Sequence, residues 1–293
     1  MTAVNRQLVL HSRPKGMLAP GDLQLKETAV PGLQDGQALA RVKYLSIDPT
    51  MRIWMAADSY LPAVAIGEVM RSFGFAEIVE SRHPDYRKGD RVTGFTGLQD
   101  YVAVELASQA FQKVPKIPFA TGSIVGQIGK IRGCRVVGIA GTDDKCNWLS
   151  KDLGFDAAIN YKHRDWKGKL AAAVPDGIDI DFENVGGEIM QTVLGLMNLH
   201  GRVVVCGLIS GYNKQDPGMM SLGTVILKRL RVEGFLLLDY VSRFMEAATQ
   251  LGQWKMFGKI KDRETIVEGL EKTPDAINML FTGANTGKLI VKI

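Results

Sequence analysis

The pattern of hydrophobic and polar positions divides the chain near residue 110. Before this point, short apolar or alternating runs are separated by turns rich in Gly, Pro and Asp. Period-two runs between such turns are typical of a compact β-rich domain. We expect its strands at 7–10, 23–27, 37–45, 74–80, 90–95 and 101–104.

From Gly122 onward, strand-like and helix-like patterns alternate. Continuous apolar strands alternating with amphipathic helices indicate a doubly wound parallel sheet that is covered on both faces. The expected strands are 135–140, 157–160, 178–184, 202–208 and 232–238, and the expected helices are 123–132, 143–153, 165–173, 187–197, 221–229 and 240–257.

The end of the chain indicates a return to the first domain. A helical turn at 275–281 leads to a last apolar strand at 287–293. The pattern therefore predicts an α/β protein with two domains. One consists of residues 1–112 and 271–293, and the other consists of residues 113–270.

The segment from Gly122 to Lys145 carries the main functional signal. Gly122 opens an apolar-periodic helix, and the strand that follows ends at Ala140 and Gly141. Glycine at such a turn lets a pyrophosphate approach the free N–H groups of a helix N-terminus. An acid at the end of the second strand would bind the ribose hydroxyl of NAD, whereas Gly141 with Lys145 four residues later suits a 2′-phosphate. This pattern predicts an NADP site; the alternative for Lys145 is a solvated lysine on a helix face.

The strand that should precede the glycine turn is absent from the sequence. Residues 111–120 contain two prolines and no uninterrupted apolar run. Proline cannot donate a hydrogen bond to a central β ladder. On this segment alone, an ordinary αβ pair explains the pattern about as well as a cofactor site does.

Composition excludes several classes of function. The chain has 293 residues, a formal net charge of +5, 46% hydrophobic residues and 23% charged residues. Its basic residues are scattered among acids, which argues against a nucleic-acid surface. No apolar run approaches the length of a membrane span or of a signal-peptide core. The cysteines Cys134, Cys146 and Cys206 lack metal-binding spacing and predict reduced core thiols in a cytoplasmic protein.

Motifs along almost the whole chain resemble the zinc-independent medium-chain dehydrogenase/reductases. The resemblance is to the branch of leukotriene B4 12-hydroxydehydrogenase/prostaglandin reductase, 2-alkenal reductase and curcumin reductase. Thr50 departs from it, because relatives usually have an aromatic residue after the Asp-Pro pair. The matching segments are 45–52 (LSIDPTMR), 67–71, 89–92, 125–127, 134–145, 179–187 (DIDFENVGG), 205–210, 228–235 and 287–291.

The resemblance implies a GroES-like β domain, completed by the C-terminal strand, next to a Rossmann domain. It implies NADPH as cofactor, reduction of the carbon–carbon double bond of an enone or enal, and a homodimer. Relatives carry roughly 40 further residues before Thr121, including the first Rossmann strand. Either the printed sequence omits this segment or the protein lacks it, and the remaining cofactor pattern favours the first explanation.

Particular site residues follow from the resemblance and from their positions. Asn184 ends a strand at the carboxyl edge of the sheet, where open α/β sheets bind ligands. Tyr60 and Tyr240 match substrate-cleft positions, and a tyrosine hydroxyl stabilises the developing enolate oxygen. Interface packing is the alternative for both tyrosines. The resemblance places Tyr161, Cys206, Phe235, Leu237 and Asn285 at the cofactor, with core packing or simple turn formation as alternatives.

No metal site is expected, because the four histidines are scattered and no ligand cluster is apparent. Two other functions remain open. The first is a quinone oxidoreductase of the same superfamily. The second is a noncatalytic NADPH-binding protein, which the absent segment makes plausible.

Overall fold

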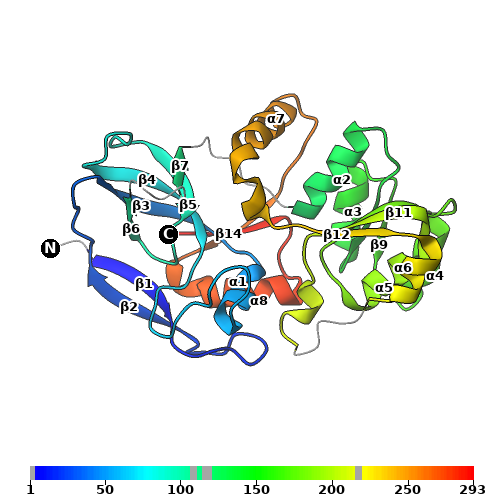
Figure 1. Cartoon of the computed structure of the whole chain (residues 1–293), viewed down its shortest axis with the longest axis horizontal. Helices are drawn as coiled ribbons and strands as arrows, with labels where there is room; N and C mark the ends of the chain where they lie inside the picture. Colours follow the sequence, from blue (N-terminus) through cyan, green and yellow to red (C-terminus); the bar gives the residue numbers. More distant parts are fainter. Residues whose placement is uncertain (1–3, 106–110, 114–120, 215–219) are drawn as a thin grey trace. The chain divides into compact units, whose positions relative to one another are not determined.

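The computed structural model describes residues 4–105, 111–113, 121–214 and 220–293 (Figure 1). Contacts divide the chain into two compact units: Met1–Pro118 with Glu264–Ile293, and Phe119–Arg263. We call these the β-rich unit and the Rossmann-like unit. The two prolines of the 111–120 segment lie outside the described residues.

The β-rich unit contains a seven-stranded sheet in the order β13-β14-β3-β4-β5-β7, with β6 also paired to β3. Alternate residues of β4, namely Gly74, Ala76 and Ile78, are buried, as expected for a strand with one face on a core. A separate antiparallel pair is formed by β1 (Val4–Leu10) and β2 (Leu23–Ala29). The sheet strands are β3 (Gln37–Ser46), β4 (Phe73–Ser81), β5 (Arg91–Phe95), β6 (Tyr101–Glu105), β7 (Phe111–Lys113), β13 (Glu264–Glu268) and β14 (Lys288–Lys292).

Three elements of this unit, α1, β7 and β13, were not expected from the sequence. Helix α1 (Thr50–Ala56) buries Met51, Trp54 and Met55, and this i, i+3, i+4 spacing is a helical signal too short to stand out. Strand β13 pairs in parallel with β14, so contacts assign residues 264–270 to the β-rich unit instead of to the second domain. Helix α8 (Thr273–Thr282) follows a short 3-10 turn, η4 (Leu270–Lys272), and leads to β14.

The last strand is anchored by an ion pair as well as by its ladders. Strand β14 pairs with β3 on one side and with β13 on the other. Lys288 Nζ lies 2.5 Å from Asp48 Oδ1, and Ser46 donates a short hydrogen bond to Asp48. Burial alone would raise the pKa of Asp48, but Lys288 and Ser46 lower it below its ordinary value.

The Rossmann-like unit alternates helices with short parallel strands. Figure 1 shows α2 and α3 on one side of the strands and α4, α5 and α6 on the other. The elements are α2 (Thr121–Ile131), β8 (Val137–Ala140), α3 (Asp143–Asn147) with a π-helical turn η1 (Trp148–Asp152), β9 (Ala157–Asn160), α4 (Trp166–Ala173), β10 (Ile178–Glu183), α5 (Gly187–Leu196), β11 (Met197–Val205), η2 (Ile209–Gly211), α6 (Leu222–Lys228), β12 (Arg231–Gly234), η3 (Leu237–Arg243) and α7 (Phe244–Met256).

The strands of this unit form two separate parallel ladders, β8-β9 and β10-β11-β12. The expected single sheet is therefore interrupted. In a Rossmann sheet the strand order is 3-2-1-4-5-6. The two ladders correspond to 3-2 and 4-5-6, so the strand missing from the sequence belongs between β8 and β10. Strand β8, which we expected to be buried, is only half-buried at every residue, and Ile180 of β10 is 52% exposed.

Several predicted boundaries differ from the structure. The expected strand 202–208 is β11, which begins five residues earlier and ends at Val205. The expected strand 232–238 ends at Gly234, because a 3-10 turn begins at Leu237. Cys134 is exposed instead of lying in the core, because it follows the turn at Gly133 that ends α2.

We expect Lys288→Met to reduce the free energy of unfolding by about 1–3 kcal/mol, because it leaves the Asp48 carboxylate without its cation. A lowered folded-state pKa stabilises the fold above the ordinary carboxyl value and loses that effect as pH falls through the lowered value. The difference in stability between wild type and variant should thus be full at neutral pH and shrink as pH falls, as measured by urea titrations at several pH values. The control is Lys292→Met, on the same strand as Lys288, which breaks the exposed ion pair with Glu268 of β13 and should have a clearly smaller effect. Equal losses in the two variants would contradict this account.

Asp181 of β10 should make the stability of the Rossmann-like unit dependent on pH. Burial, and then Glu183, raise the pKa of Asp181 to about 7, and its Oδ2 is buried without a partner. A raised carboxyl pKa stabilises the fold below the unfolded value of about 3.9, and this contribution is lost as pH rises through 7. Asp181→Asn should therefore raise the melting temperature at pH 8 and leave it almost unchanged at pH 4. The control is Asp179→Asn at an exposed position of the same strand; a similar gain there would refute the explanation.

Candidate cofactor-binding site

The carboxyl ends of β8 and β9 meet at Gly141 and Tyr161. Tyr161 N donates to the carbonyl of Ala140 at 3.0 Å. A Cβ atom placed on Gly141 would lie 3.1 Å from the Tyr161 hydroxyl, which is tighter than most real contacts of that kind. The end of β8 therefore favours a glycine, and the tyrosine hydroxyl occupies the region that an acidic side chain would otherwise fill.

Two lysines approach each other beside this corner. Lys145 lies in α3. Its backbone N–H donates to Oγ1 of the N-cap residue Thr142 at 3.2 Å. Burial lowers the pKa of Lys145, and the charge of Lys162 lowers it further. An anion bound between two such ammonium groups would offset both effects.

The nearby acid Asp143 is engaged by other side chains. Asn160 Nδ2 donates to its carboxylate at 2.9 Å, and His163 Nε2 lies 3.1 Å away. The hydrogen bond from Asn160 lowers the pKa of Asp143, with further lowering by the charge of His163. These contacts stabilise the negative charge of the Asp143 carboxylate, which lies two residues after Gly141.

Glu183 organises the turn after β10. Its side chain is 3% exposed, and Oε1 accepts from Val185 N at 2.5 Å and from Gly186 N at 3.0 Å. The predicted residues Asn184 and Gly122 meet here, since a Cβ on Gly122 would lie 4.0 Å from Asn184 Nδ2. The N-terminus of α2 thus lies beside the end of β10. Sequence reasoning missed Glu183, although an acid ending a buried strand before a Val-Gly-Gly turn was a usable signal.

Three of the predicted residues gather after β11 and β12. Cys206 N donates to the carbonyl of Glu183 at 2.8 Å, and burial raises the pKa of the Cys206 thiol. Phe235 N donates to the carbonyl of Val205 at 3.4 Å. The ring of Phe235 packs edge-on against that of Tyr240, with 6.1 Å between the ring centroids. Leu237 extends away and is 60% exposed.

The remaining predicted residues belong to the β-rich unit. Tyr60 OH lies 2.6 Å from Thr50 Oγ1, and its ring packs edge-on against Trp54 at 6.4 Å. Thr50, which departs from the family pattern, therefore contacts the very tyrosine that we expected to act on substrate. Asn285 Nδ2 donates to the carbonyl of Gly287 at 3.1 Å, which is a turn-forming contact.

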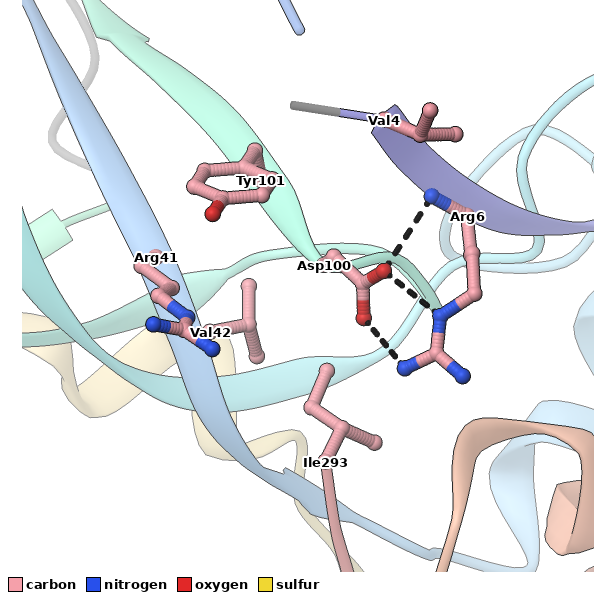
Figure 2. A pocket seen from close by; sticks show the side chains of 7 residues that line it. All are labelled: Val4, Arg6, Arg41, Val42, Asp100, Tyr101 and Ile293. Carbon is pink, nitrogen blue, oxygen red and sulfur yellow. Dashed lines mark hydrogen bonds and ion pairs between the residues drawn. The ribbon is translucent and has the colours of Figure 1, made fainter. Parts of the chain in front are cut away.

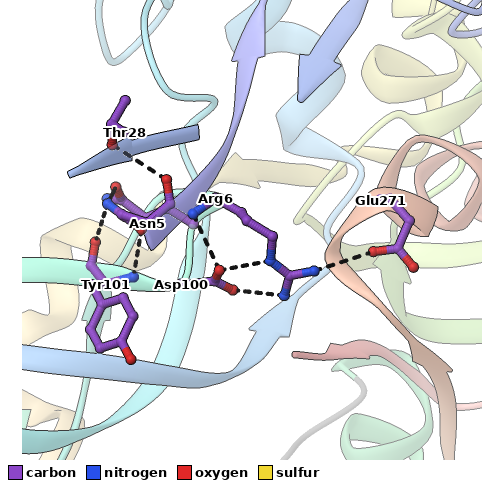
Figure 3. Close-up of polar contacts among 7 residues, drawn as sticks. Asn5, Arg6, Thr28, Asp100, Tyr101 and Glu271 are labelled. Atoms are coloured by element: carbon purple, nitrogen blue, oxygen red, sulfur yellow. Dashed lines mark hydrogen bonds and ion pairs between the residues drawn. The ribbon is translucent and has the colours of Figure 1, made fainter. Parts of the chain in front are cut away.

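A cavity of about 290 Å³ in the β-rich unit contains none of the predicted site residues (Figure 2). Arg6 donates to Asp100 at 2.8 and 3.0 Å and lies 3.8 Å from Glu271 (Figure 3). Arg6 and Asp100 at this cavity are therefore already paired with each other within the protein. Its lining consists of Val4, Arg6, Arg41, Val42, Asp100, Tyr101 and Ile293.

Metal-binding clusters and membrane-spanning helices are both absent from the described residues. Within the described residues, no group of three or more His, Cys, Asp and Glu side chains is arranged to hold a metal ion. No helix in the same part of the chain combines the length and apolar character needed to cross a bilayer.

A β-rich unit joined to a Rossmann-like unit with a glycine-ended strand defines a class of two-domain, nucleotide-dependent oxidoreductases. Family models agree with this class: residues 6–114 match the N-terminal domain of oxidoreductase, and residues 120–253 match zinc-binding dehydrogenase. The chain belongs to the medium-chain dehydrogenase/reductases, in the branch that includes curcumin reductase and 2-alkenal reductase.

Individual relatives match over nearly their whole length. The chain is 39% identical to NADPH-dependent curcumin reductase of Escherichia coli, with 99% of this chain and 97% of the relative covered. It is 34% identical to 2-alkenal reductase (NADP(+)-dependent) of Nicotiana tabacum, with 99% and 97% covered. The structure of CurA from Vibrio vulnificus in complex with NADPH matches with a TM-score of 0.91 at 35% identity, covering 98% of each chain. The resemblance and the two-part α/β fold predicted from the sequence are thereby confirmed.

The alignments also measure what this chain lacks. The alignment with curcumin reductase extends over 334 positions, 41 more than the 293 residues of this chain. At least 41 aligned positions are therefore residues of curcumin reductase that have no counterpart in this chain. This difference agrees with the predicted loss of about 40 residues, and the interrupted sheet has an open position where such a segment belongs.

Proposed function

We propose that the protein is an NADPH-dependent reductase of the carbon–carbon double bond in α,β-unsaturated ketones and aldehydes. The observation that carries this proposal is the corner formed by Gly141, Tyr161, Lys145 and Lys162. It combines a strand end without an acid, a hydroxyl and two cations, which suits a ribose 2′-phosphate. The names of the relatives, curcumin reductase and 2-alkenal reductase, support the substrate class.

The described residues fit the adenosine end of the cofactor best. Tyr161, Lys145 and Lys162 would hold the 2′-phosphate, and Gly122 with Asn184 would lie beside the pyrophosphate. We assign Cys206, Phe235 and Leu237 to the nicotinamide end and Asn285 to the phosphates. When bound, NADPH supplies the hydride for the β-carbon of the substrate.

The protein's own contribution to the chemistry is assigned to two tyrosines. A tyrosine hydroxyl that donates to the substrate carbonyl binds more tightly as negative charge develops on that oxygen. If Thr50 donates to Tyr60 in their 2.6 Å contact, the Tyr60 proton remains available to the substrate. Tyr240 is oriented by its edge-on contact with Phe235, and its hydroxyl is assigned the same role.

The proposal includes a zinc-independent reaction, catalysed by a homodimer in the cytoplasm. Donors to the enolate oxygen make a Lewis acid unnecessary for this chemistry. The three cysteines are free thiols, which supports a reducing compartment. The homodimer rests on the family resemblance.

Lys145→Ala should raise the Kd for NADPH by about tenfold to a hundredfold, because it removes one of two cations from the 2′-phosphate corner. NADH lacks that phosphate, so its Kd should change by less than about twofold. Quenching of protein fluorescence during titration with each nucleotide measures both values. Lys151→Ala, in the helical turn after α3, is the matched control. Equal weakening for both nucleotides would remove the 2′-phosphate role from Lys145.

Oxidation of NADPH by the purified protein, followed at 340 nm, should be fast with a 2-alkenal and slow with 1,4-benzoquinone. Tyr240→Phe or Tyr60→Phe should lower kcat by about a hundredfold, because each loses a donor to the developing oxyanion, and should leave the Kd for NADPH unchanged. Tyr101→Phe, at the separate cavity of the β-rich unit, is the control.

The other outcomes of this assay select the alternative functions. Turnover of quinones without alkenals would identify a quinone oxidoreductase. NADPH binding without turnover of either substrate would identify a noncatalytic NADPH-binding protein.

A further inference from the structure

The loop that carries Tyr60 follows α1 in the β-rich unit and is closed by short contacts of its own. Ala63 N donates to the Asp58 carboxylate at 2.9 Å. Ser59 N donates to the carbonyl of Leu61 at 3.0 Å. Leu61 packs against the core, whereas Tyr60 is 38% exposed. The orientation of the Tyr60 ring therefore depends on the few side chains that contact it.

Trp54 of α1 is one of these side chains. The centroids of the Trp54 and Tyr60 rings lie 6.4 Å apart in an edge-on arrangement. Trp54 is 3% exposed, yet its indole N–H is buried without a hydrogen-bond partner among the described residues. A buried indole N–H usually finds such a partner. Packing contacts therefore hold this indole in place without help from a hydrogen bond.

Arg71 contacts both this indole and the far end of the loop. Its guanidinium carbon lies 5.4 Å from the centroid of the Trp54 ring, within the range of a cation–π interaction. Its Nη1 donates to the carbonyl of Pro62 at 3.0 Å. In the described part of the chain, this carbonyl is its one hydrogen-bond acceptor, and no carboxylate forms an ion pair with it. The guanidinium thus joins α1 to the segment that follows Tyr60.

The backbone on either side of Arg71 is fixed by the fold. Met70 N donates to the carbonyl of Leu8 at 2.9 Å. Leu98 N donates to the carbonyl of Met70, also at 2.9 Å. Met70 and Ser72, the two neighbours of Arg71, are both 0% exposed. Arg71 therefore projects from a well-anchored segment, which limits the movement of its guanidinium.

We propose that Arg71 is a positioning residue for the reduction and acts through Tyr60. By holding the indole beside the tyrosine ring and the carbonyl that follows it, Arg71 keeps the Tyr60 hydroxyl oriented before the substrate arrives. A donor that is already oriented stabilises the developing oxyanion without a cost of reorganisation. The inference rests on the proposed function, in which Tyr60 donates to the substrate carbonyl.

A double-mutant cycle on alkenal turnover tests this role. Arg71→Met keeps an unbranched stem and removes both contacts, so it should lower kcat about tenfold when residue 60 is tyrosine. In the Tyr60→Phe background no hydroxyl is left to position, and the same substitution should lower kcat by less than about twofold. The KM for the alkenal should change by less than about twofold, because the donor acts on the transition state. A purely structural defect would lower kcat by the same factor in both backgrounds.

A graded variant and a matched control accompany the cycle. A lysine ammonium can lie over the indole or donate to the Pro62 carbonyl, but it lacks the planar fork that does both. Arg71→Lys should therefore give a kcat between those of wild type and Arg71→Met. The control is Arg41→Met, at an exposed position of β3, which should keep kcat within about twofold of wild type. Circular dichroism checks that every variant folds.

Hydrogen exchange measures the order of the loop independently of activity. In Arg71→Met, the amides of Ser59 and Ala63 should exchange at least about fivefold faster than in wild type, because the loop loses its connection to α1. In Arg41→Met, the exchange of both amides should match wild type.

The outcomes separate this inference from the function on which it rests. Equal losses of kcat in the two backgrounds, an unchanged kcat in Arg71→Met, or unchanged exchange at the loop amides would each overturn the role of Arg71 alone. If Tyr60→Phe by itself leaves kcat unchanged, or if the wild-type protein turns over no alkenal, the proposed role of Tyr60 is wrong and the inference fails with it.

Discussion

Hydrogen bonding along both edges of a buried parallel sheet is the constraint on which the Rossmann-like unit depends. Each interior strand must pair on two sides, because no water reaches its backbone. Among the described residues, the requirement is met within β8-β9 and within β10-β11-β12, and no strand joins the two ladders. The half-buried residues of β8, the exposed Ile180 and the unpartnered oxygen of Asp181 all lie on the two strands that border this interruption.

The same interruption divides the candidate site. The corner of Gly141, Tyr161 and Lys145 belongs wholly to the β8-β9 side and is stabilised by contacts within that ladder and α3. The turn held by Glu183 belongs to the other ladder. Cofactor binding across both ladders therefore requires that their spacing be held.

In the β-rich unit, the interior strands are paired on both sides because the end of the chain returns to the sheet as β14. Strand β14 fills the place between β3 and β13, so β3 gains a partner from the other end of the chain, as the Lys288–Asp48 pair across 240 residues also shows. The Lys288–Asp48 pair joins the same two segments through side chains. Asp48 precedes α1, whose Thr50 contacts Tyr60, so the ion pair also helps to position a proposed catalytic residue.

Local patterns determined much of this protein. Periodicity placed most strands and helices, Gly141 with Lys145 indicated the cofactor class, and the prolines before α2 revealed the missing strand, because each signal lies within a few consecutive residues. The approach of Lys162 to Lys145, the contact of Thr50 with Tyr60, the anchoring role of Glu183 and the pairing of β13 with β14 were decided by the tertiary structure. Those contacts join separate elements, and their geometry depends on how the elements pack, which no local pattern encodes.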